Sequence, residues 1–308
     1  MNAADPGTAV RSEADLPSNS LLASIDIGTN SAILLIADRK DGHLRPVIQK
    51  VAAPRVGRNL AATGLISEES FAALTSALEE YLAEVRAAGA TLVGAVATEA
   101  FRKAANGPAL LARVSAQLGL DCRILSGEEE ARLGWLAVSD RHPLPGLAVL
   151  DIGAGSTEVT GAEGGVSLPL GAVALLEACG PSPVDCRAKA AVPFMEGPDW
   201  VKAAGNLVVV GGTATALAML KLEMRVFDAA AIEGLSLGAA DVTSAIDRLA
   251  ALSAEERAAL PGLDPGRAEI VVPGLCILEA FLSFAGMERF QVSDRGIRYG
   301  VILDGLGK

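Results

Sequence analysis

The chain has 308 residues, of which 51% are hydrophobic and 20% are charged, an ordinary composition for a well-packed α/β protein. This length suits two domains of about 150 residues each. The formal net charge of −11 argues against a nucleic-acid-binding protein, because that role needs a basic surface. No apolar run approaches the ~20 residues that span a bilayer, so no membrane association is expected.

The N-terminal segment and the cysteines bear on the compartment. Residues 1–20 are polar, lack a basic start and an apolar stretch, and predict a disordered tail rather than a signal peptide. The four cysteines show no C-x-x-C spacing, and the chain has only two histidines, His43 and His142, in loops without a partner pattern. A disulfide framework or zinc site is therefore not expected, and the cytoplasm is the expected location.

The first predicted domain begins with two apolar strands, residues 21–25 and 32–37, joined by a short polar turn. A third strand over 44–51 follows, and then a helix that Ser67 caps and Gly89 ends. The rest of the domain is predicted as strand 92–97, helix 108–118, strand 123–125 and a helix from Gly127.

The second predicted domain restarts this order at Asp151, with strands near Val159 and Ser167 and a helix over 173–179. Residues 181–198 contain four prolines without periodicity and are predicted to form a loop or a degenerate element. The remaining prediction is strand 206–210, a helix after Gly211-Gly212-Thr213, helices 240–252, 253–260 and 267–284, strand 290–293, and a helix over 296–306 that packs back on the first domain.

The turns of the two hairpins are near-copies that lie 125 residues apart and are suited to phosphate binding. Glycine lets the backbone approach phosphate oxygens closely, and hydroxyl and amide groups add donors. The strand–Gly-Gly-Thr–helix segment presents a helix N-terminus, which is a ready anion site. The predicted phosphate-binding residues are Gly28, Thr29, Asn30, Ser31, Gly153, Ala154, Gly155, Ser156, Thr157, Gly211, Gly212 and Thr213. Asp26 and Asp151 are predicted to hold Mg²⁺ through its waters.

Six motifs in this order make the chain resemble the exopolyphosphatase / guanosine-pentaphosphate phosphatase (Ppx/GppA) family over residues 20–305. They are Asp26–Ser31 (DIGTNS), Thr98–Arg102 (TEAFR), Ser126–Arg132 (SGEEEAR), Asp151–Glu158 (DIGAGSTE), Gly211–Thr213 (GGT) and Arg267–Gly274 (RAEIVVPG). Each motif alone is weak, but six in order are specific. The resemblance implies an α/β fold of two actin-like, ribonuclease H-like domains with a cleft between them. Domain I is expected at 21–138 plus the C-terminal helix 296–308, and domain II at 139–295.

The resemblance also implies a hydrolase that removes a terminal phosphate from inorganic polyphosphate. It assigns Glu130 as the base that activates water, with Glu129 as the runner-up. Glu158 is implied as a second carboxylate that places the water or the metal ion, and Arg102 is expected to neutralise developing charge. Taken alone, a glutamate triplet at the start of a helix more often complements the helix dipole than takes part in catalysis, and Gly-Gly-Thr more often forms a turn than a ligand site. The resemblance favours a site in both cases.

Several alternatives stay open at this stage. The same motifs fit hydrolysis of guanosine pentaphosphate (pppGpp), and a non-hydrolytic phosphate- or nucleotide-binding protein is a further alternative. The expected cofactor is Mg²⁺; substitution by Mn²⁺, stimulation by a monovalent cation and a homodimer are not decided by the sequence. A kinase is disfavoured because the Glu-Glu-Ala-Arg motif points to water as the phosphate acceptor.

Two features leave the substrate less certain than the reaction. Ala154 stands where the family usually has glycine, which is tolerable only if the backbone there does not need positive φ, and Glu233 replaces a family histidine. An acidic chain repels long polyphosphate, so binding would need a local basic path. Candidates for that path are Arg55, Arg58, Arg102, Lys103 and Arg298. Longer family members carry an extra C-terminal domain that this sequence does not contain, and we therefore expect a preference for short chains or a nucleotide.

Overall fold

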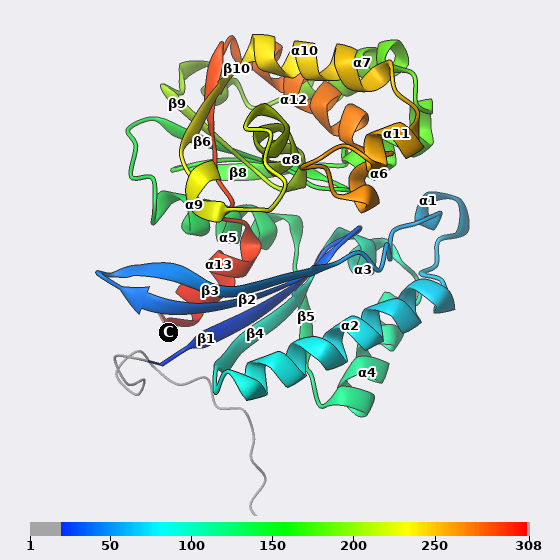
Figure 1. The fold of residues 1–308 in the computed structure, drawn as a ribbon, viewed down its shortest axis with the longest axis vertical. Helices are drawn as coiled ribbons and strands as arrows, with labels where there is room; N and C mark the ends of the chain where they lie inside the picture. The colour runs from blue at the N-terminus through cyan, green and yellow to red at the C-terminus, as the bar shows by residue number, and fades with distance from the viewer. Residues whose placement is uncertain (1–19, 307–308) are drawn as a thin grey trace, which may run out of the picture.

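The computed structural model describes residues 20–306, which form two α/β units stacked one above the other (Figure 1). Residues 1–19 of the predicted tail and residues 307–308 lie outside the described residues. The first unit contains a five-stranded mixed sheet in the order β3-β2-β1-β4-β5. Its strands are β1 (Leu22–Ile27), β2 (Ala32–Lys40), β3 (His43–Ala52), β4 (Thr91–Ala97) and β5 (Cys122–Ile124).

The three longer helices of the first unit follow the predicted pattern, whereas its two short helices, Leu60–Thr63 and Glu99–Lys103, were not predicted. The helices are α1 (Leu60–Thr63), α2 (Glu68–Ala87), α3 (Glu99–Lys103), α4 (Gly107–Leu118) and α5 (Gly127–Ser139). The hydroxyl of Ser67 accepts from the Ser70 amide, and the side chain of Ser126 forms a capping box with Glu129. The apolar face of α2, with Phe71 and Leu74, is buried in the core of the first unit.

The second unit is built on a six-stranded sheet in the order β10-β11-β9-β6-β7-β8. Its strands are β6 (Leu147–Ile152), β7 (Thr157–Gly161), β8 (Gly164–Leu168), β9 (Asn206–Val210), β10 (Leu235–Gly238) and β11 (Arg289–Val292). The run β8-β7-β6-β9-β11 matches β3-β2-β1-β4-β5 of the first sheet strand for strand, and β10 is an added edge. The two units are therefore repeats of one topology, as an actin-like fold requires.

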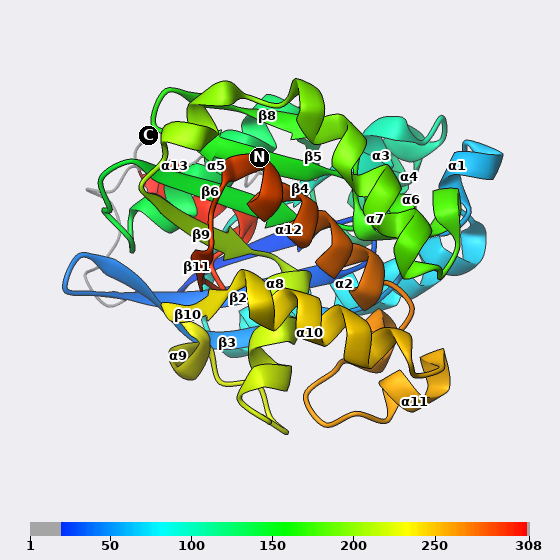
Figure 2. The same ribbon diagram turned by 90° about the horizontal axis from the view of Figure 1, so that it is seen from above.

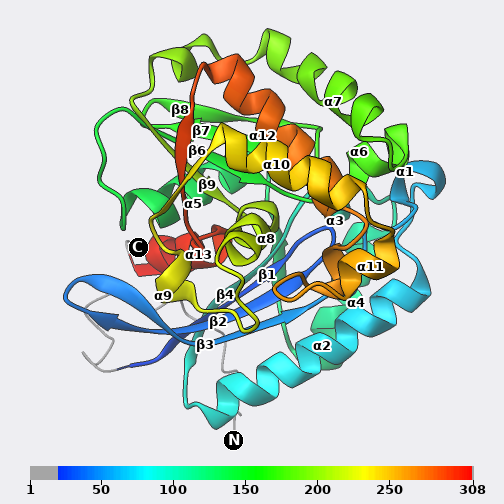
Figure 3. The same ribbon diagram turned by 45° about the horizontal axis from the view of Figure 1, so that its top comes forward.

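The helical segments of the second unit are α6 (Ala172–Cys179), α7 (Pro183–Ala191), η2 (Val192–Glu196), η3 (Asp199–Ala203), α8 (Gly212–Lys221), α9 (Ala229–Ile232), α10 (Ala239–Ala250), α11 (Ala254–Ala258), η4 (Pro265–Arg267) and α12 (Val271–Ala285). Helix α12 lies between α7 and α10 in the second unit, as Figures 2 and 3 show, and it also packs against α6 and α8. No helix among residues 20–306 is both long enough and apolar enough to cross a bilayer.

The prediction of a loop or degenerate element over residues 181–198 was wrong. Ser182 caps α7 by accepting from the Asp185 amide, and Pro183 occupies the first turn, where its missing N–H costs no hydrogen bond. The helix buries Cys186 and Ala190 against α12. Its short apolar face, only two fully buried residues, explains why periodicity did not reveal it.

The chain crosses between the units twice, after α5 and after β11. The second crossing leads into α13 (Ile297–Leu306), which packs against α5, β1 and β4 of the first unit (Figure 1). Ser24 of β1 donates a hydrogen bond of 2.7 Å to the carbonyl of Arg298. The C-terminal helix therefore returns to the first unit, and both crossings lie beside the space between the sheets.

Candidate active site

The two glycine-containing turns have the same backbone geometry. The Gly28 amide donates to the Ser31 carbonyl over 2.8 Å, and the Gly153 amide donates to the Ser156 carbonyl over 2.9 Å. The tips face each other across the two units: a Cβ placed on Gly155 would lie 2.9 Å from the Thr29 hydroxyl and would collide with the Glu99 carboxylate. Only glycine allows this approach, so the two turns enclose a space between the units.

A cavity of about 130 Å³ lies between the two turns. All of the predicted phosphate-binding residues line it except Thr157 and Thr213. The Thr157 hydroxyl donates to the Leu170 carbonyl instead, and Thr213 packs against Gly274 of α12. Ten of the twelve predicted residues are thus brought together around one space that is small enough to hold a phosphoryl group.

Four carboxylates from four different elements converge on this cavity: Asp26 of β1, Glu130 of α5, Asp151 of β6 and Glu158 of β7. Asp151 and Glu158 are directly opposite in the antiparallel β6–β7 pair, whereas Asp26 has Ile33 opposite it in β1–β2. The two hairpins therefore match in their turns but not in charge. The second hairpin supplies two carboxylates, and the first supplies one.

Burial raises the pKa values of all four carboxyls. The pKa of Asp26 rises to about 7 and that of Asp151 to about 6, with Arg298 opposing the shift in both cases. Glu158 is shifted well above its ordinary pKa by burial and by the neighbouring Glu130 and Asp151, against hydrogen bonds from Ser167 and Ser156. Such crowding of acidic groups in a cleft is typical of a site that binds a cation or moves a proton.

The adjacent glutamates of α5 point to different surroundings. Glu130 is 3% exposed, lines the cavity and pairs with Arg102, whose guanidinium also donates to the Leu125 carbonyl over 2.6 Å. Burial raises the pKa of Glu130 to about 7, although Arg102 lowers it. The Glu129 carboxylate accepts a hydrogen bond from the Ser126 amide and pairs with Arg123 outside the cavity, and these interactions hold its pKa below the usual range. Arg102 itself is not part of the cavity wall.

Sequence reasoning missed Arg267 as a site residue and named Arg298 as a candidate for a local basic path. Both guanidiniums line the cavity. Arg267 lies over Gly212, where any Cβ would collide with it, and Arg298 is 5% exposed and donates to Asp294 over 2.8 Å. Arg298 therefore lies in the wall of the cavity itself. Arg267 opens the sixth quoted motif, RAEIVVPG, which was the available signal.

The residues present fit a hydrated divalent cation. The Oδ1 atom of Asp26 is buried without a hydrogen-bond partner among the described residues, which suits an atom that accepts from a cation's water. Within residues 20–306, no three His, Cys, Asp or Glu side chains are close enough together to ligate a metal directly. Since Mg²⁺ prefers oxygen ligands and keeps several of its waters, Asp26, Asp151 and Glu158 are suited to hold it through those waters.

The crossings between the units are tied by a polar network that the sequence did not predict. His142, which follows α5, lies 2.5 Å from Glu233, and Ser293, which follows β11, donates to the same carboxylate over 2.9 Å. The sequence around His142 shows no partner pattern, because Glu233 lies 91 residues away along the chain. Burial would raise the pKa of Glu233, but its hydrogen bonds from His142 and Ser293 hold it below the usual range. His43 lies 3.6 Å from Asp140, which also pairs with Arg295.

A larger cavity of about 440 Å³ adjoins the first one and shares Gly211, Gly212, Arg267 and Arg298 with it. Val51 and Met219 give it an apolar wall, and Phe227 and Arg225 also line it. The space beyond the phosphate-sized cavity is therefore suited to a substituent larger than phosphate.

Comparison with known proteins gives a consistent result over nearly the whole chain. The model of the Ppx/GppA phosphatase family matches residues 35–308. Exopolyphosphatase 2 of Mycobacterium tuberculosis is 31% identical over 314 residues, covering 92% of this chain and 97% of the relative. The Aquifex aeolicus Ppx/GppA crystal structure is 30% identical, with a TM-score of 0.76 over 92% of this chain and 97% of that one. An exopolyphosphatase of Cytophaga hutchinsonii, 24% identical with a TM-score of 0.83, covers 93% and 98% and shares the fold.

Proposed function

The chain belongs to the Ppx/GppA phosphatase family, and from this we propose that it is an exopolyphosphatase that releases orthophosphate from the end of inorganic polyphosphate. The observation that carries the proposal is the position of Glu130, whose carboxyl lines the same cavity as both glycine turns. That arrangement puts a proton acceptor, hydrogen-bond donors to phosphate and two guanidiniums around one phosphate-sized space. Its relatives named as exopolyphosphatases support the choice of substrate.

In this proposal the terminal phosphoryl group binds between the two turns. Backbone amides and hydroxyls of Thr29 and Ser156 donate to its oxygens, and Arg267 and Arg298 neutralise the charge that develops on them. Water attacks the phosphorus in line with the bridging oxygen. The bond from phosphorus to that oxygen breaks, and the shortened chain leaves with the bridging oxygen.

Glu130 accepts the proton of the attacking water. Its raised pKa, at about 7, makes it a better base than an ordinary carboxylate while leaving a useful ionised fraction at neutral pH. Arg102 fixes the carboxylate from outside the cavity and favours its ionised form. Mg²⁺ held by Asp26, Asp151 and Glu158 would supply charge neutralisation and polarise bound water. Mn²⁺ as its substitute and a stimulating monovalent cation belong to the same proposal.

Hydrolysis of pppGpp at the same site is the second candidate. The adjoining cavity of about 440 Å³ favours it, because a nucleoside is larger than phosphate and needs an apolar wall. A non-hydrolytic phosphate-binding protein is the third candidate, and the four cavity carboxylates argue against it. We place the protein in the cytoplasm, and a homodimer is compatible with the proposal.

The test is release of orthophosphate from polyphosphates of increasing chain length and from pppGpp, each with Mg²⁺ or with EDTA. We expect Mg²⁺-dependent release from polyphosphate, with higher kcat/KM for short chains than for long ones because the surface is acidic. Release only from pppGpp would replace the first candidate by the second. No release from any substrate, with phosphate binding retained, would establish the non-hydrolytic alternative.

A further inference from the structure

Three of the four cysteines gather where α6, α7 and α12 meet, outside the cavity of the candidate active site. Cys179 ends α6 and Cys186 lies in the middle of α7, and their sulfur atoms are 2.9 Å apart. The sulfur of Cys276 on α12 lies 3.9 Å from the Pro183 carbonyl, at the start of α7. Cysteine spacing in the sequence does not reveal this cluster, because it depends on the turn between α6 and α7.

The geometry points to a modification site: we propose that Cys179 and Cys186 form an intramolecular disulfide when the protein meets a peroxide. The sulfur atoms need to approach by only about 0.9 Å to reach the ~2.04 Å of an S–S bond. The two cysteines lie on consecutive helices joined by Gly180, Pro181 and Ser182. A small change in this short turn brings the sulfurs together.

The alternatives for this cluster are weaker. A metal site is disfavoured, because no group of three His, Cys, Asp or Glu in the described part of the chain can hold a metal ion. Pairing of Cys186 with Cys276 is disfavoured, because the sulfur of Cys186 contacts that of Cys179, whereas the sulfur of Cys276 contacts the Pro183 carbonyl. The remaining cysteine, Cys122, lies on β5 in the first unit.

Exposure decides the order of the chemistry. Cys179 is partly exposed, whereas Cys186 is fully buried, and burial next to Cys179 raises the pKa of the Cys186 thiol. The Cys179 thiolate therefore attacks the peroxide first: an S–O bond forms, the O–O bond breaks, and the leaving hydroxide takes a proton to become water. The Cys186 sulfur then attacks the Cys179 sulfur. The S–S bond forms, the S–O bond breaks, and the hydroxide leaves as water with the Cys186 proton.

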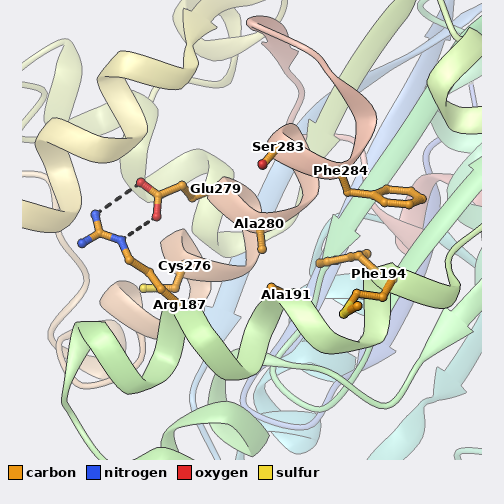
Figure 4. Close-up of a pocket in the computed structure, with 9 residues that line it drawn as sticks. Arg187, Ala191, Phe194, Cys276, Glu279, Ala280, Ser283 and Phe284 are labelled. Atoms are coloured by element: carbon orange, nitrogen blue, oxygen red, sulfur yellow. Dashed lines mark hydrogen bonds and ion pairs between the residues drawn. The ribbon is translucent and has the colours of Figure 1, made fainter.

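Cys276 is the internal comparison for this reaction. It contributes to a surface cavity of about 440 Å³ between α7 and α12, whose wall also contains the Arg187–Glu279 ion pair and the ring of Phe284 (Figure 4). If entry through this cavity alone determined which cysteine is oxidised, the modification would appear on Cys276 rather than on the Cys179–Cys186 pair.

The disulfide would also restrain the helix that supports the second glycine turn. At the start of α6, the amide of Ala172 donates to the Gly153 carbonyl over 3.0 Å and that of Val173 to the Ala154 carbonyl over 2.8 Å. Cys179 lies at the other end of the same helix. The bond would fasten α6 to α7 while leaving the turn contacts themselves unchanged.

The test uses the full-length protein treated with hydrogen peroxide, unfolded in N-ethylmaleimide and digested with trypsin. Because no Lys or Arg lies between His142 and Cys186, both thiols fall in one peptide, residues 142–187, and Cys276 falls in another, 268–289. We expect the first peptide to lose two hydrogen atoms and to carry no maleimide, while Cys122 and Cys276 are alkylated. Dithiothreitol should restore two alkylation sites in it.

Matched variants make the result decisive. Cys122→Ser should leave the mass loss intact, and Cys179→Ser should abolish it, with circular dichroism showing that both variants are folded. Oxidation of the unfolded chain should give mixed pairings, since the preference depends on the folded geometry. Full alkylation of residues 142–187 after peroxide treatment, or a cross-link from Cys186 to Cys276, would overturn the proposal. The result does not depend on whether the protein hydrolyses polyphosphate.

Discussion

Ala154 and Gly155 occupy the tip of the second turn, and their structural roles differ. Among the described residues, the four non-glycine residues with positive φ do not include Ala154, so alanine fits this backbone without strain. Gly155 lies against the Glu99 carboxylate and the Thr29 hydroxyl of the first unit, which leaves no room for a Cβ. The departure from the family pattern at Ala154 is therefore structurally harmless, whereas Gly155 is required.

We predict opposite outcomes for substitutions at these neighbours. Gly155→Ala should force the two turns apart and lower kcat/KM by about 100-fold, because misplacement of about 1 Å has that effect on catalysis. Ala154→Gly should leave kcat/KM within about twofold and lower the free energy of unfolding by about 0.4–1 kcal/mol through a more flexible unfolded chain. Phosphate release and chemical denaturation measure both. Equal activity losses in the two variants would contradict this interpretation of the tip.

The residues of the site were predictable to the extent that they lie in local motifs. A glycine turn preceded by an aspartate is recognisable from consecutive residues, and ten of twelve predicted phosphate-binding residues line the cavity. Arg298 and Arg267 reach it only because α13 and the segment before α12 fold back between the sheets. Such long-range approach leaves little trace in local spacing.

At the scale of elements, the order of the central strands and longer helices was predictable because buried strands and capped helices leave strong local patterns, whereas the edge strand β10 and the shortest helices were not predicted. The sequence failed at α7, where few apolar residues and several prolines obscured the period, and at the contact between His142 and Glu233, which are 91 residues apart. Polar partners from separate crossings between the units cannot be paired from spacing alone.

The network at the crossings should contribute to stability. Replacing Glu233 by alanine leaves His142 and the Ser293 hydroxyl without their common partner in a mostly buried place, where an unsatisfied polar group costs about 1–3 kcal/mol. We expect Glu233→Ala to lower the free energy of unfolding by that amount in urea denaturation. Glu288→Ala, at an exposed position, is the matched control and should change it by less than about 0.5 kcal/mol. Equal effects of the two substitutions would show that the network adds nothing.

At the scale of the whole molecule, stability should depend on pH through the cavity between the units. The pKa values of Asp26 and Asp151 are raised in the folded state to about 7 and about 6, so the folded state binds more protons than the unfolded state near pH 5. The stability that these groups contribute is fully present below their unfolded pKa values and is lost as pH rises through 6 to 7.

Mg²⁺ should reverse this loss, because it binds the ionised carboxylates. We predict that Mg²⁺ at ten times its dissociation constant raises Tm by about 3 °C at pH 8 and by much less at pH 5. Differential scanning fluorimetry measures both shifts, and Asp26→Asn together with Asp151→Asn should remove the shift at pH 8. A Tm shift of equal size at the two pH values would place the cation outside this carboxylate cluster.

The most direct measurement compares single glutamine substitutions at three successive glutamates of α5 in an assay of phosphate release from polyphosphate. Glu130 faces the cavity, Glu129 caps the helix and pairs with Arg123, and Glu128 is exposed. Loss of a positioned base lowers rates by about 10²–10⁴-fold, and we predict a fall of that size in kcat for Glu130→Gln alone. Glu129→Gln and Glu128→Gln should retain kcat within about threefold. Full turnover by Glu130→Gln, or a loss confined to Glu129→Gln, would contradict the assignment of Glu130 as the base.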